Sequence, residues 1–268
     1  MNTALKQHNK NHLRAAQLKE LEILKAIDQV CRNNDIPYWL DSGTLLGAVR
    51  HGGFIPWDDD VDICIPLEDI PRFVEAAKKE LPNHLFVQNK ETDPTYNITY
   101  VKVRDNNSFI VEPDYDFQQP YHKGLFVDIF PTTDYPAISP KRIRKFAREY
   151  NKAYFILNRK HDYSMRSTAE FFYFGFRKLY FKLCWNLSYK FFGKGDKYGF
   201  IPSCSWFGNM HLKETIFPLK EIEFEGISLM CPNDNDTYLK DLFGDYMQLP
   251  PEEKRVGHSV FFTHDLSL

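Results

Sequence analysis

Apolar residues recur at helical spacing in the first part of the chain. Between about residues 13 and 31 they lie three or four positions apart, which is the spacing of one buried helix face, and the polar run Asn33-Asn34-Asp35 ends the pattern. A second helix is expected over residues 71–81, since Pro71 suits a first helical turn and Pro82 stops the helix. Both helices therefore present one apolar face to a core.

Strand-like segments follow. Residues 60–65 alternate polar and apolar side chains with period two, the pattern of a strand with one buried face. Other strand-like runs lie at residues 38–40, 96–103, 109–112, 124–130 and 222–230, and short helices are expected over residues 45–49 and 236–243. The mixture predicts an α/β (α+β) fold in which helices flank a mixed sheet.

Residues 141–200 differ from the rest of the chain. They contain 15 Lys and Arg against 4 Asp and Glu, a local net charge of +11. Because the whole chain has a net charge of −2, the remaining residues together carry a net charge of −13. Apolar residues here approximate one helical face: Phe172, Phe176, Leu179, Leu183 and Leu187. The charge favours a polyanion or an anionic surface as partner, although a solvated helix face has the same composition. We interpret the segment as a basic, aromatic helical insert between a core of residues 1–140 and a C-terminal segment, residues 201–268, that completes the core.

Cysteine usage and hydropathy indicate the compartment. The five cysteines are odd in number, widely spread and never in a C-x-x-C pair, so neither a disulfide framework nor a zinc site is expected. The first residues lack the apolar core of a secretory signal, and no stretch reaches ~18 apolar residues without charge. We therefore expect a globular protein in the reducing cytoplasm.

Aspartates at the start of the strand expected over residues 60–65 carry the main chemical signal. Asp60 and Asp62 are two positions apart, so their carboxylates project from one face, only ~7 Å from each other. Burying both is costly unless a cation compensates, and Mg²⁺ prefers such oxygen ligands. A third acid, Asp128, interrupts the apolar run 124–130 and completes a three-carboxylate site if the two strands are neighbours. Asp59 points to the other side and is expected to be dispensable.

Acidic runs more often decorate solvated loops, so their context matters. The aspartates open an apolar strand and lie downstream of Ser42-Gly43-Thr44, a turn of small residues whose N–H groups can approach a phosphate. We therefore interpret the carboxylates as a metal site that handles phosphate.

Two segments carry a family resemblance: residues 38–51 (YWLDSGTLLGAVRH) and residues 53–62 (GFIPWDDDVD) resemble the LicD family. That family includes bacterial phosphocholine transferases, and the fukutin-related protein contains a similar domain. Weaker similarity continues at residues 102–104, 126–131 and 244–258, so the resemblance brackets most of the chain except the basic insert. In the wider superfamily the glycine turn lies closer to the acidic pair than the 17 positions from Gly43 to Asp60, a spacing that is usual for LicD-like sequences.

The resemblance implies a nucleotidyltransferase-like fold and a metal-dependent phosphotransferase that uses Mg²⁺ or Mn²⁺. Its donor would be CDP-choline or a related CDP-alcohol, and its acceptor a sugar hydroxyl of a glycan or lipid-linked glycan, such as a lipopolysaccharide or teichoic acid precursor. The implied catalytic residues are Asp60, Asp62 and Asp128, with Asp58 as a further metal ligand. The implied substrate contacts are Ser42, Gly43, Thr44, Arg50, His51, Trp57, Lys102, Arg104 and His258.

Other functions remain open at this point. The same carboxylates would serve a nucleotidyltransferase that deposits NMP and releases pyrophosphate, or a metal-dependent glycosyltransferase with an Asp-x-Asp pair. A non-enzymatic anion-binding module would rest on the basic insert alone. Nucleic acid is not expected as a partner. A peripheral membrane contact through residues 141–200 is expected at the inner face of the membrane, though a core-facing helix explains the aromatic residues equally well.

Overall fold

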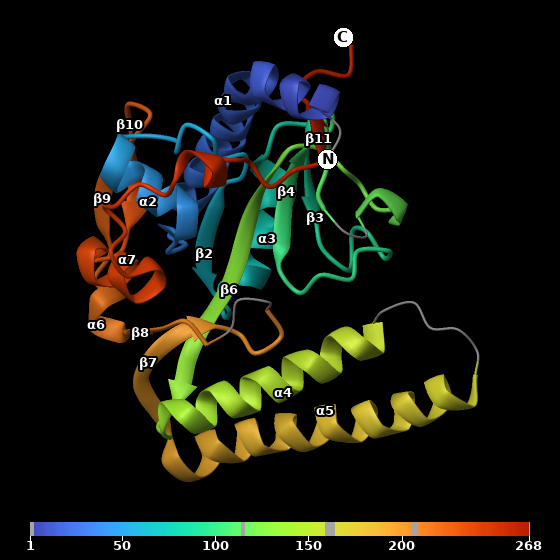
Figure 1. The fold of residues 1–268 in the computed structure, drawn as a ribbon. Helices are drawn as coiled ribbons and strands as arrows, with labels where there is room; N and C mark the ends of the chain where they lie inside the picture. The colour runs from blue at the N-terminus through green and yellow to red at the C-terminus, as the bar shows by residue number, and fades with distance from the viewer. Residues whose placement is uncertain (1–2, 114–115, 159–163, 205–207, 268) are drawn as a thin grey trace. The chain divides into compact units, whose positions relative to one another are not determined.

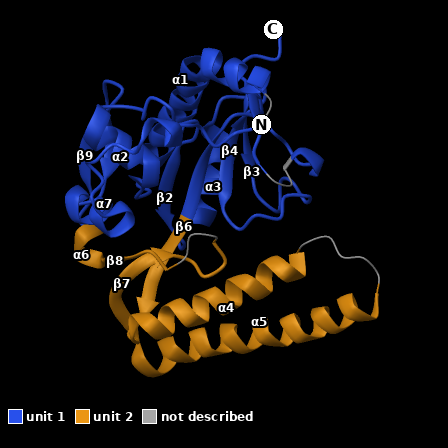
Figure 2. Ribbon diagram, in the orientation of Figure 1, with its two compact units in different colours: residues 1–130, 217–268 blue, residues 131–216 orange. Residues whose placement is uncertain are grey.

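The computed structural model describes residues 3–113, 116–158, 164–204 and 208–267. The chain forms two compact units (Figure 2). Unit 1 comprises residues 1–130 and 217–268, and unit 2 comprises residues 131–216. The long strand β6 (Phe126–Pro136) begins in unit 1 and continues into unit 2.

Unit 1 contains a mixed sheet with the strand order β1-β2-β6-β4-β3 (Figure 1). Its strands besides β6 are β1 (Trp39–Leu40), β2 (Asp62–Pro66), β3 (Leu85–Gln88) and β4 (Val101–Asp105). β1 pairs antiparallel with β2, and β4 pairs antiparallel with both β3 and β6. The predicted α/β fold is confirmed, and β2 and β6 are neighbours, as the three-carboxylate hypothesis requires.

Four longer helices belong to unit 1: α1 (Thr3–Asn33), α2 (Ser42–His51), α3 (Ile70–Glu80) and α7 (Asn235–Phe243). Helix α1 includes the first described residues as well as the periodic segment from residue 13, and its buried face follows the predicted spacing through Leu24, Ile27 and Val30. Helix α3 has Pro71 in its first turn, as expected. The Asp234 side chain caps α7 by accepting a bond from the Thr237 N–H.

The expectation of one strand over residues 222–230 is wrong. The segment is a hairpin of β9 (Lys220–Phe224) and β10 (Ile227–Cys231). Its turn residues, Glu225 and Gly226, have φ angles of 52° and 76°, the left-handed conformation that a two-residue hairpin turn requires. A second small sheet pairs β5 (Phe109–Val111) with β11 (Phe261–Thr263). Short 3₁₀ turns lie at η1 (Asp116–Gln118) and η2 (Glu252–Lys254).

Three other element boundaries differ from expectation. The strand predicted from Asp60 begins only at Asp62, so Asp60 lies in the loop before β2. The turn predicted at Ser42-Gly43-Thr44 is the first turn of α2, which starts directly after β1. The strand predicted from residue 96 begins at Val101.

Unit 2 is a helical hairpin attached to two strands. It consists of α4 (Pro140–Asn158), α5 (Met165–Phe192), β7 (Lys194–Phe200), β8 (Met210–Leu212) and α6 (Lys213–Ile216). Its core is small and contains Tyr135, Ile143, Ala147 and Trp185. Strand β7 pairs antiparallel with both β6 and β8. None of the helices in the described ranges is long and apolar enough to span a bilayer.

Gly47→Ala is expected to lower the unfolding temperature, because a methyl group on this residue of α2 would overlap the backbone carbonyl oxygen of Gly53. The overlap involves two backbone segments, so relief requires a backbone shift that costs about 1–3 kcal/mol. Circular dichroism during heating should show a loss of at least about 2 °C for a chain of this size.

Gly175→Ala in α5 is the matched control, because a methyl group there meets nothing within 4 Å. Alanine also favours a helix over glycine by up to about 1 kcal/mol, so this variant should be as stable as the parent or slightly more stable. Equal losses in both variants would show that the contact with Gly53 is not the cause.

Candidate active site

The acidic loop, residues 58–61, is held on both sides by side chains from neighbouring helices. The Gln17 side chain of α1 donates to the Asp58 carbonyl oxygen at 2.9 Å. At the other end of the loop, the Asp62 N–H donates to the Thr44 hydroxyl oxygen of α2 at 2.8 Å. These bonds fix the backbone, so the positions of the carboxylates are set by α1 and α2 as well as by the sheet.

Asp62 and Asp128 lie on neighbouring strands. The Asp128 N–H donates to the Val61 carbonyl oxygen at 2.8 Å, which places β6 directly beside the end of the acidic loop. Desolvation raises the pKa of Asp62 well above its usual value, and the charges of Asp60 and Asp128 raise it further. The structure thus brings the three predicted catalytic aspartates into one electrostatic cluster.

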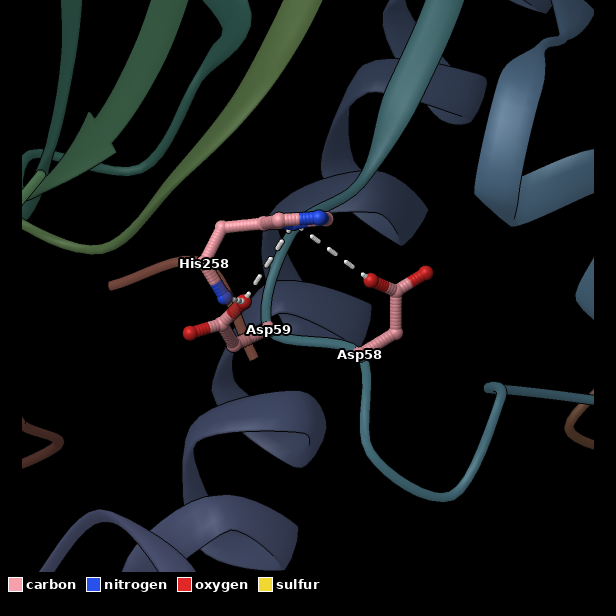
Figure 3. Close-up of side chains that lie close together, drawn as sticks. All are labelled: Asp58, Asp59 and His258. Atoms are coloured by element: carbon pink, nitrogen blue, oxygen red, sulfur yellow. Dashed lines mark hydrogen bonds and ion pairs between the residues drawn. The ribbon is translucent and has the colours of Figure 1, made fainter. Parts of the chain in front are cut away.

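Asp58, Asp59 and His258 form the one group in the described residues whose ligand atoms all lie within 4.8 Å of one another (Figure 3). The His258 ring nitrogen Nδ1 lies 3.8 Å from carboxylate oxygens of Asp58 and Asp59 and 3.6 Å from Asp60. The hydrogen bond and charge of Asp60 raise the pKa of His258 to about 9. A protonated imidazole therefore faces three carboxylates at neutral pH.

The buried carboxyl groups outnumber the basic side chains beside them, so their ionised forms are unfavourable without a further cation. Desolvation raises the pKa of Asp58 well above its usual value, and the neighbouring Asp60 raises it further. Burial also raises the pKa of Asp128 to about 7, although the Lys102 ammonium group lowers it. Carboxylate oxygens that are buried, clustered and short of positive charge fit a hard divalent cation. Among the described residues, Asp58, Asp59 and His258 offer ligand atoms close enough together to hold one. The predicted ligands Asp60, Asp62 and Asp128 belong to the same electrostatic cluster, and their binding of a metal stays a prediction.

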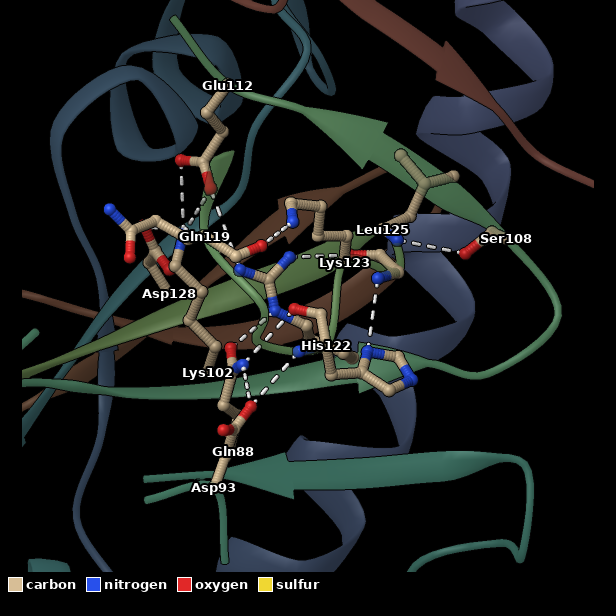
Figure 4. A network of polar contacts seen from close by, with 12 residues as sticks. Gln88, Asp93, Lys102, Ser108, Glu112, Gln119, His122, Lys123, Leu125 and Asp128 are labelled. Carbon is tan, nitrogen blue, oxygen red and sulfur yellow. Dashed lines mark hydrogen bonds and ion pairs between the residues drawn. The ribbon is translucent and has the colours of Figure 1, made fainter. Parts of the chain in front are cut away.

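Lys102 is buried against the carboxylates (Figure 4). Its ammonium nitrogen lies 2.9 Å from an Asp128 oxygen and 3.2 Å from a Glu112 oxygen. It also lies 3.3 Å from the centre of the Phe126 ring. Lys102 is therefore a counter-charge of Asp128, and its predicted contact with phosphate stays a prediction.

Arg104, the other predicted phosphate contact of β4, is also buried. Its Nε donates to the Gln88 side-chain oxygen at 2.5 Å and its Nη1 to the Gly124 carbonyl oxygen at 2.7 Å. Its Nη2 lies 3.6 Å from Glu112, which Lys102 also contacts. Arg104 thus connects β4 to Gln88 of β3 and to the Gly124 backbone, and its contact with phosphate stays a prediction.

The segment Ser42-Gly43-Thr44 supports the acidic loop. A methyl group on Gly43 would lie only 2.5 Å from an Asp58 carboxylate oxygen, so glycine permits the close approach of that carboxylate to α2. Ser42 has a φ of 46° and donates its hydroxyl proton to Asp41 at 3.1 Å. These contacts give the three small residues a role in positioning the carboxylates. A direct contact with phosphate stays a prediction.

Arg50, His51 and Trp57 lie together at the end of α2. The Arg50 guanidinium donates to the Tyr246 carbonyl oxygen at 2.7 Å and to the His51 ring at 3.0 Å. The His51 ring contacts the Trp57 ring edge to face, with centres 6.3 Å apart. Arg255 lies 5.4 Å from the centre of the Trp57 ring. The predicted substrate contacts thus form a basic and aromatic cluster.

Glu20 is an important residue that the sequence pattern did not single out. It lies on α1 with no solvent exposure, and neither carboxylate oxygen has a hydrogen-bond partner. Burial raises its pKa well above the usual value, and the charges of Asp59 and Asp60 raise it further. The signal was available, since Gln17 and Glu20 are polar residues three positions apart on an otherwise apolar helix face.

Comparison with known proteins gives one family and several relatives. The family described as "LicD/FKTN/FKRP, nucleotidyltransferase domain" matches residues 35–156. The chain is 28% identical over 260 residues to "Lipopolysaccharide cholinephosphotransferase LicD" of Haemophilus influenzae, covering 92% of this chain and 96% of the relative.

Two shorter matches concern mammalian proteins. The chain is 63% identical over 35 residues to "Ribitol 5-phosphate transferase FKRP" of Homo sapiens, 13% of this chain and 7% of the relative. It is 36% identical over 59 residues to "Ribitol-5-phosphate transferase FKTN" of Mus musculus, 22% of this chain and 13% of the relative. The resemblance found in the sequence is thereby confirmed.

Asp59→Ala is expected to destabilise the protein, in contrast to the expectation from sequence that Asp59 is dispensable. Asp59 is buried and accepts the backbone N–H groups of His258 and Ser259 at 2.7 and 2.8 Å. Its loss leaves two donors unpaired, at about 1–3 kcal/mol each where they are buried. Thermal unfolding should show a drop of several degrees. Asp60→Ala is the matched control, and an equal drop in that variant would contradict the anchoring role.

The metal-free protein is expected to become less stable as pH rises from 5 to 9. Asp128 has a folded pKa of about 7, above the usual value of 3.8, so the folded state keeps a proton that the unfolded chain loses and stability falls in between. His258 has a folded pKa of about 9 against 6.5, so its contribution is complete below pH 6.5 and is lost as pH rises through 9. Both groups act in the same direction. Urea unfolding in EDTA at several pH values measures this, and a stability that rises with pH would contradict it.

Proposed function

We propose that the chain transfers phosphocholine from CDP-choline to a sugar hydroxyl and releases CMP, because residues 35–156 match the LicD/FKTN/FKRP nucleotidyltransferase family and most of the chain is similar to a lipopolysaccharide cholinephosphotransferase. The observation that carries the proposal is the cluster of Asp58 and Asp60 in the acidic loop, Asp62 on β2 and Asp128 on the neighbouring β6, all inside the matched region. A buried cluster of this charge is suited to a donor diphosphate accompanied by a cation.

Choline is preferred over ribitol for a specific reason. The relative whose name contains cholinephosphotransferase matches over 92% of this chain, whereas the ribitol phosphate transferase FKRP matches over 13%. CDP-ribitol and CDP-glycerol therefore remain alternative donors for the same carboxylates.

We assign a divalent metal, Mg²⁺ or Mn²⁺, to Asp58, Asp60, Asp62 and Asp128. When bound, the ion neutralises the charge of the donor diphosphate. Asp58 and Asp62, whose pKa values are raised by desolvation, then release their protons because a cation replaces them. Mg²⁺ should accordingly raise the unfolding temperature of the protein more at pH 8 than at pH 6.

The transfer requires one base and one leaving group. The acceptor hydroxyl loses its proton to Asp128, its oxygen bonds to the phosphorus of phosphocholine, and the bond to the CMP oxygen breaks with its electron pair. Asp128 is suited to the task because Lys102 holds it at 2.9 Å and limits the rise of its pKa. Lys102 thus acts as a positioning residue for Asp128.

Trp57 is the proposed contact for the choline group. A quaternary ammonium group cannot donate a strong hydrogen bond, so its recognition relies on aromatic faces. Arg255 lies 5.4 Å from the centre of the Trp57 ring, so this ring already accommodates a cation. Trp57→Leu should raise KM for CDP-choline more than KM for CDP-ribitol, if both are substrates.

Labelled donors test the function directly. The protein is incubated with Mg²⁺, an acceptor glycan and CDP-choline labelled in the choline, and products are identified by mass spectrometry. Asp60→Ala, Asp62→Ala and Asp128→Ala should each lower kcat/KM on the order of 10³-fold, since several kcal/mol of charge stabilisation are lost. Asp196→Ala, a change at an exposed aspartate of β7, is the matched control and should retain activity.

The products separate the proposal from its alternatives. Labelled choline on the glycan with free CMP supports phosphocholine transfer. Incorporated CMP would instead indicate a nucleotidyltransferase, and consumption of a UDP-sugar would indicate a glycosyltransferase. Normal turnover by Asp128→Ala would remove Asp128 from the mechanism.

A further inference from the structure

Helix α5 exposes a row of large apolar side chains along its length. Phe172, Phe176, Leu179, Leu183, Leu187 and Phe191 follow one another at three or four positions, and here they are named the α5 stripe. Their exposed fractions range from 37% at Leu187 to 71% at Phe191. The sequence predicts that these residues share a face, and within the described part of unit 2 their side chains are left exposed.

The opposite face of α5 already completes the core of unit 2. Trp185 packs edge to face on Tyr135 with ring centres 5.4 Å apart, and Phe181 contacts Phe146 of α4. The guanidinium of Arg177 on α5 forms an ion pair with Glu149 of α4. The α5 stripe is therefore not needed to hold the helical hairpin together. Side chains of this size gain about 1.5–3 kcal/mol each on full burial, so an uncovered row of six favours a partner.

The charge of the surrounding unit selects the kind of partner. Residues 141–200 carry 15 basic against 4 acidic residues. The solvent side of α4 contributes exposed basic side chains: Lys141, Arg142, Arg144, Lys145, Arg148 and Lys152. On α5 itself, Lys182 and Lys190 are exposed within or beside the stripe. A second copy of this unit would bring like charge against like charge, whereas anionic phospholipid attracts at about 1 kcal/mol per Lys or Arg near the surface.

We infer that unit 2 binds the surface of an anionic lipid bilayer, with the α5 stripe immersed at the level of the headgroups and Lys182 and Lys190 of α5 facing lipid phosphates. The basic residues of α4, on the other side of α5, add to the positive charge of the unit. The helix lies on the membrane, since none of the described helices can cross it. Aromatic side chains suit this depth because their rings are stable between water and acyl chains. The inference rests on unit 2 alone and does not require the proposed reaction.

Vesicle flotation with the full chain at about 0.15 M salt tests the inference. One set of vesicles contains phosphatidylcholine alone, and the other contains phosphatidylcholine with phosphatidylserine. The parent protein should float with the anionic vesicles and bind the neutral ones at least tenfold more weakly. The variant Phe172→Ser/Phe176→Ser/Leu179→Ser should lose at least tenfold of this binding.

A control variant replaces large apolar residues that are also exposed, but in unit 1: Leu67→Ser, Phe117→Ser and Phe243→Ser. It should float like the parent protein, because these residues do not form a row on a basic unit. The charge reversal Lys182→Glu/Lys190→Glu keeps the stripe and should weaken binding to anionic vesicles only. If circular dichroism shows that the serine variant loses helix, the charge-reversal variant alone tests the inference.

Two results would overturn the inference. The parent protein could fail to float with anionic vesicles, or the stripe and charge variants could both float as well as the parent. The alternative partner of the α5 stripe is a second copy of this chain, which sedimentation velocity detects. If the parent protein is a dimer that does not bind vesicles, and the stripe variant is a monomer, the stripe is a contact between copies. Since none of these readouts uses turnover, the proposed reaction can fail while membrane binding holds, and the reverse.

Discussion

Negative charge that cannot leave the protein interior is the constraint on which the arrangement of unit 1 depends. Asp58, Asp59 and Asp128 are buried, Glu20 is fully enclosed without a hydrogen-bond partner, and Asp60 and Asp62 add their charge. In an interior of low polarity each carboxylate raises the pKa of its neighbours. Such a cluster persists only when protons, basic side chains or a bound cation offset it. The protein supplies Lys102 and His258, and the remaining excess is what makes the site suited to a cation.

The surrounding chain is organised to hold this cluster in place. Gln17 and Thr44 fix the backbone on either side of the acidic loop, and Gly43 leaves room for the Asp58 carboxylate. Asp59 faces away from β2 and instead accepts the N–H groups that bring His258 to the cluster. Consecutive aspartates therefore have different roles: Asp58 and Asp60 contribute charge to the cluster, whereas Asp59 anchors the backbone of residues 258–259. Neighbours of identical chemistry differ in role because the backbone turns between them.

Unit 2 combines a small core with exposed apolar and basic surface. Its core of Tyr135, Ile143, Ala147 and Trp185 is small, and only one face of α5 takes part in it. The remaining apolar face and the basic side chains of α4 are exposed in the same unit. Unit 1 concentrates negative charge where a phosphate donor and a cation would meet, whereas unit 2 gathers positive charge beside apolar surface.

The sequence by itself indicated the α/β fold, the acidic residues and the resemblance to the LicD family, because period-two alternation, an isolated charge in an apolar run and a contiguous motif are local signals. Whether the strands that carry Asp62 and Asp128 are neighbours was decided by the tertiary structure. The tertiary structure alone decided that Glu20 belongs to the cluster and that Asp59 anchors residues 258–259. Those contacts join segments up to 200 positions apart, so no window of sequence contains both partners. The α5 stripe shows the same limit: periodicity specifies that side chains share a face, and only the packing of the whole chain decides whether anything covers it.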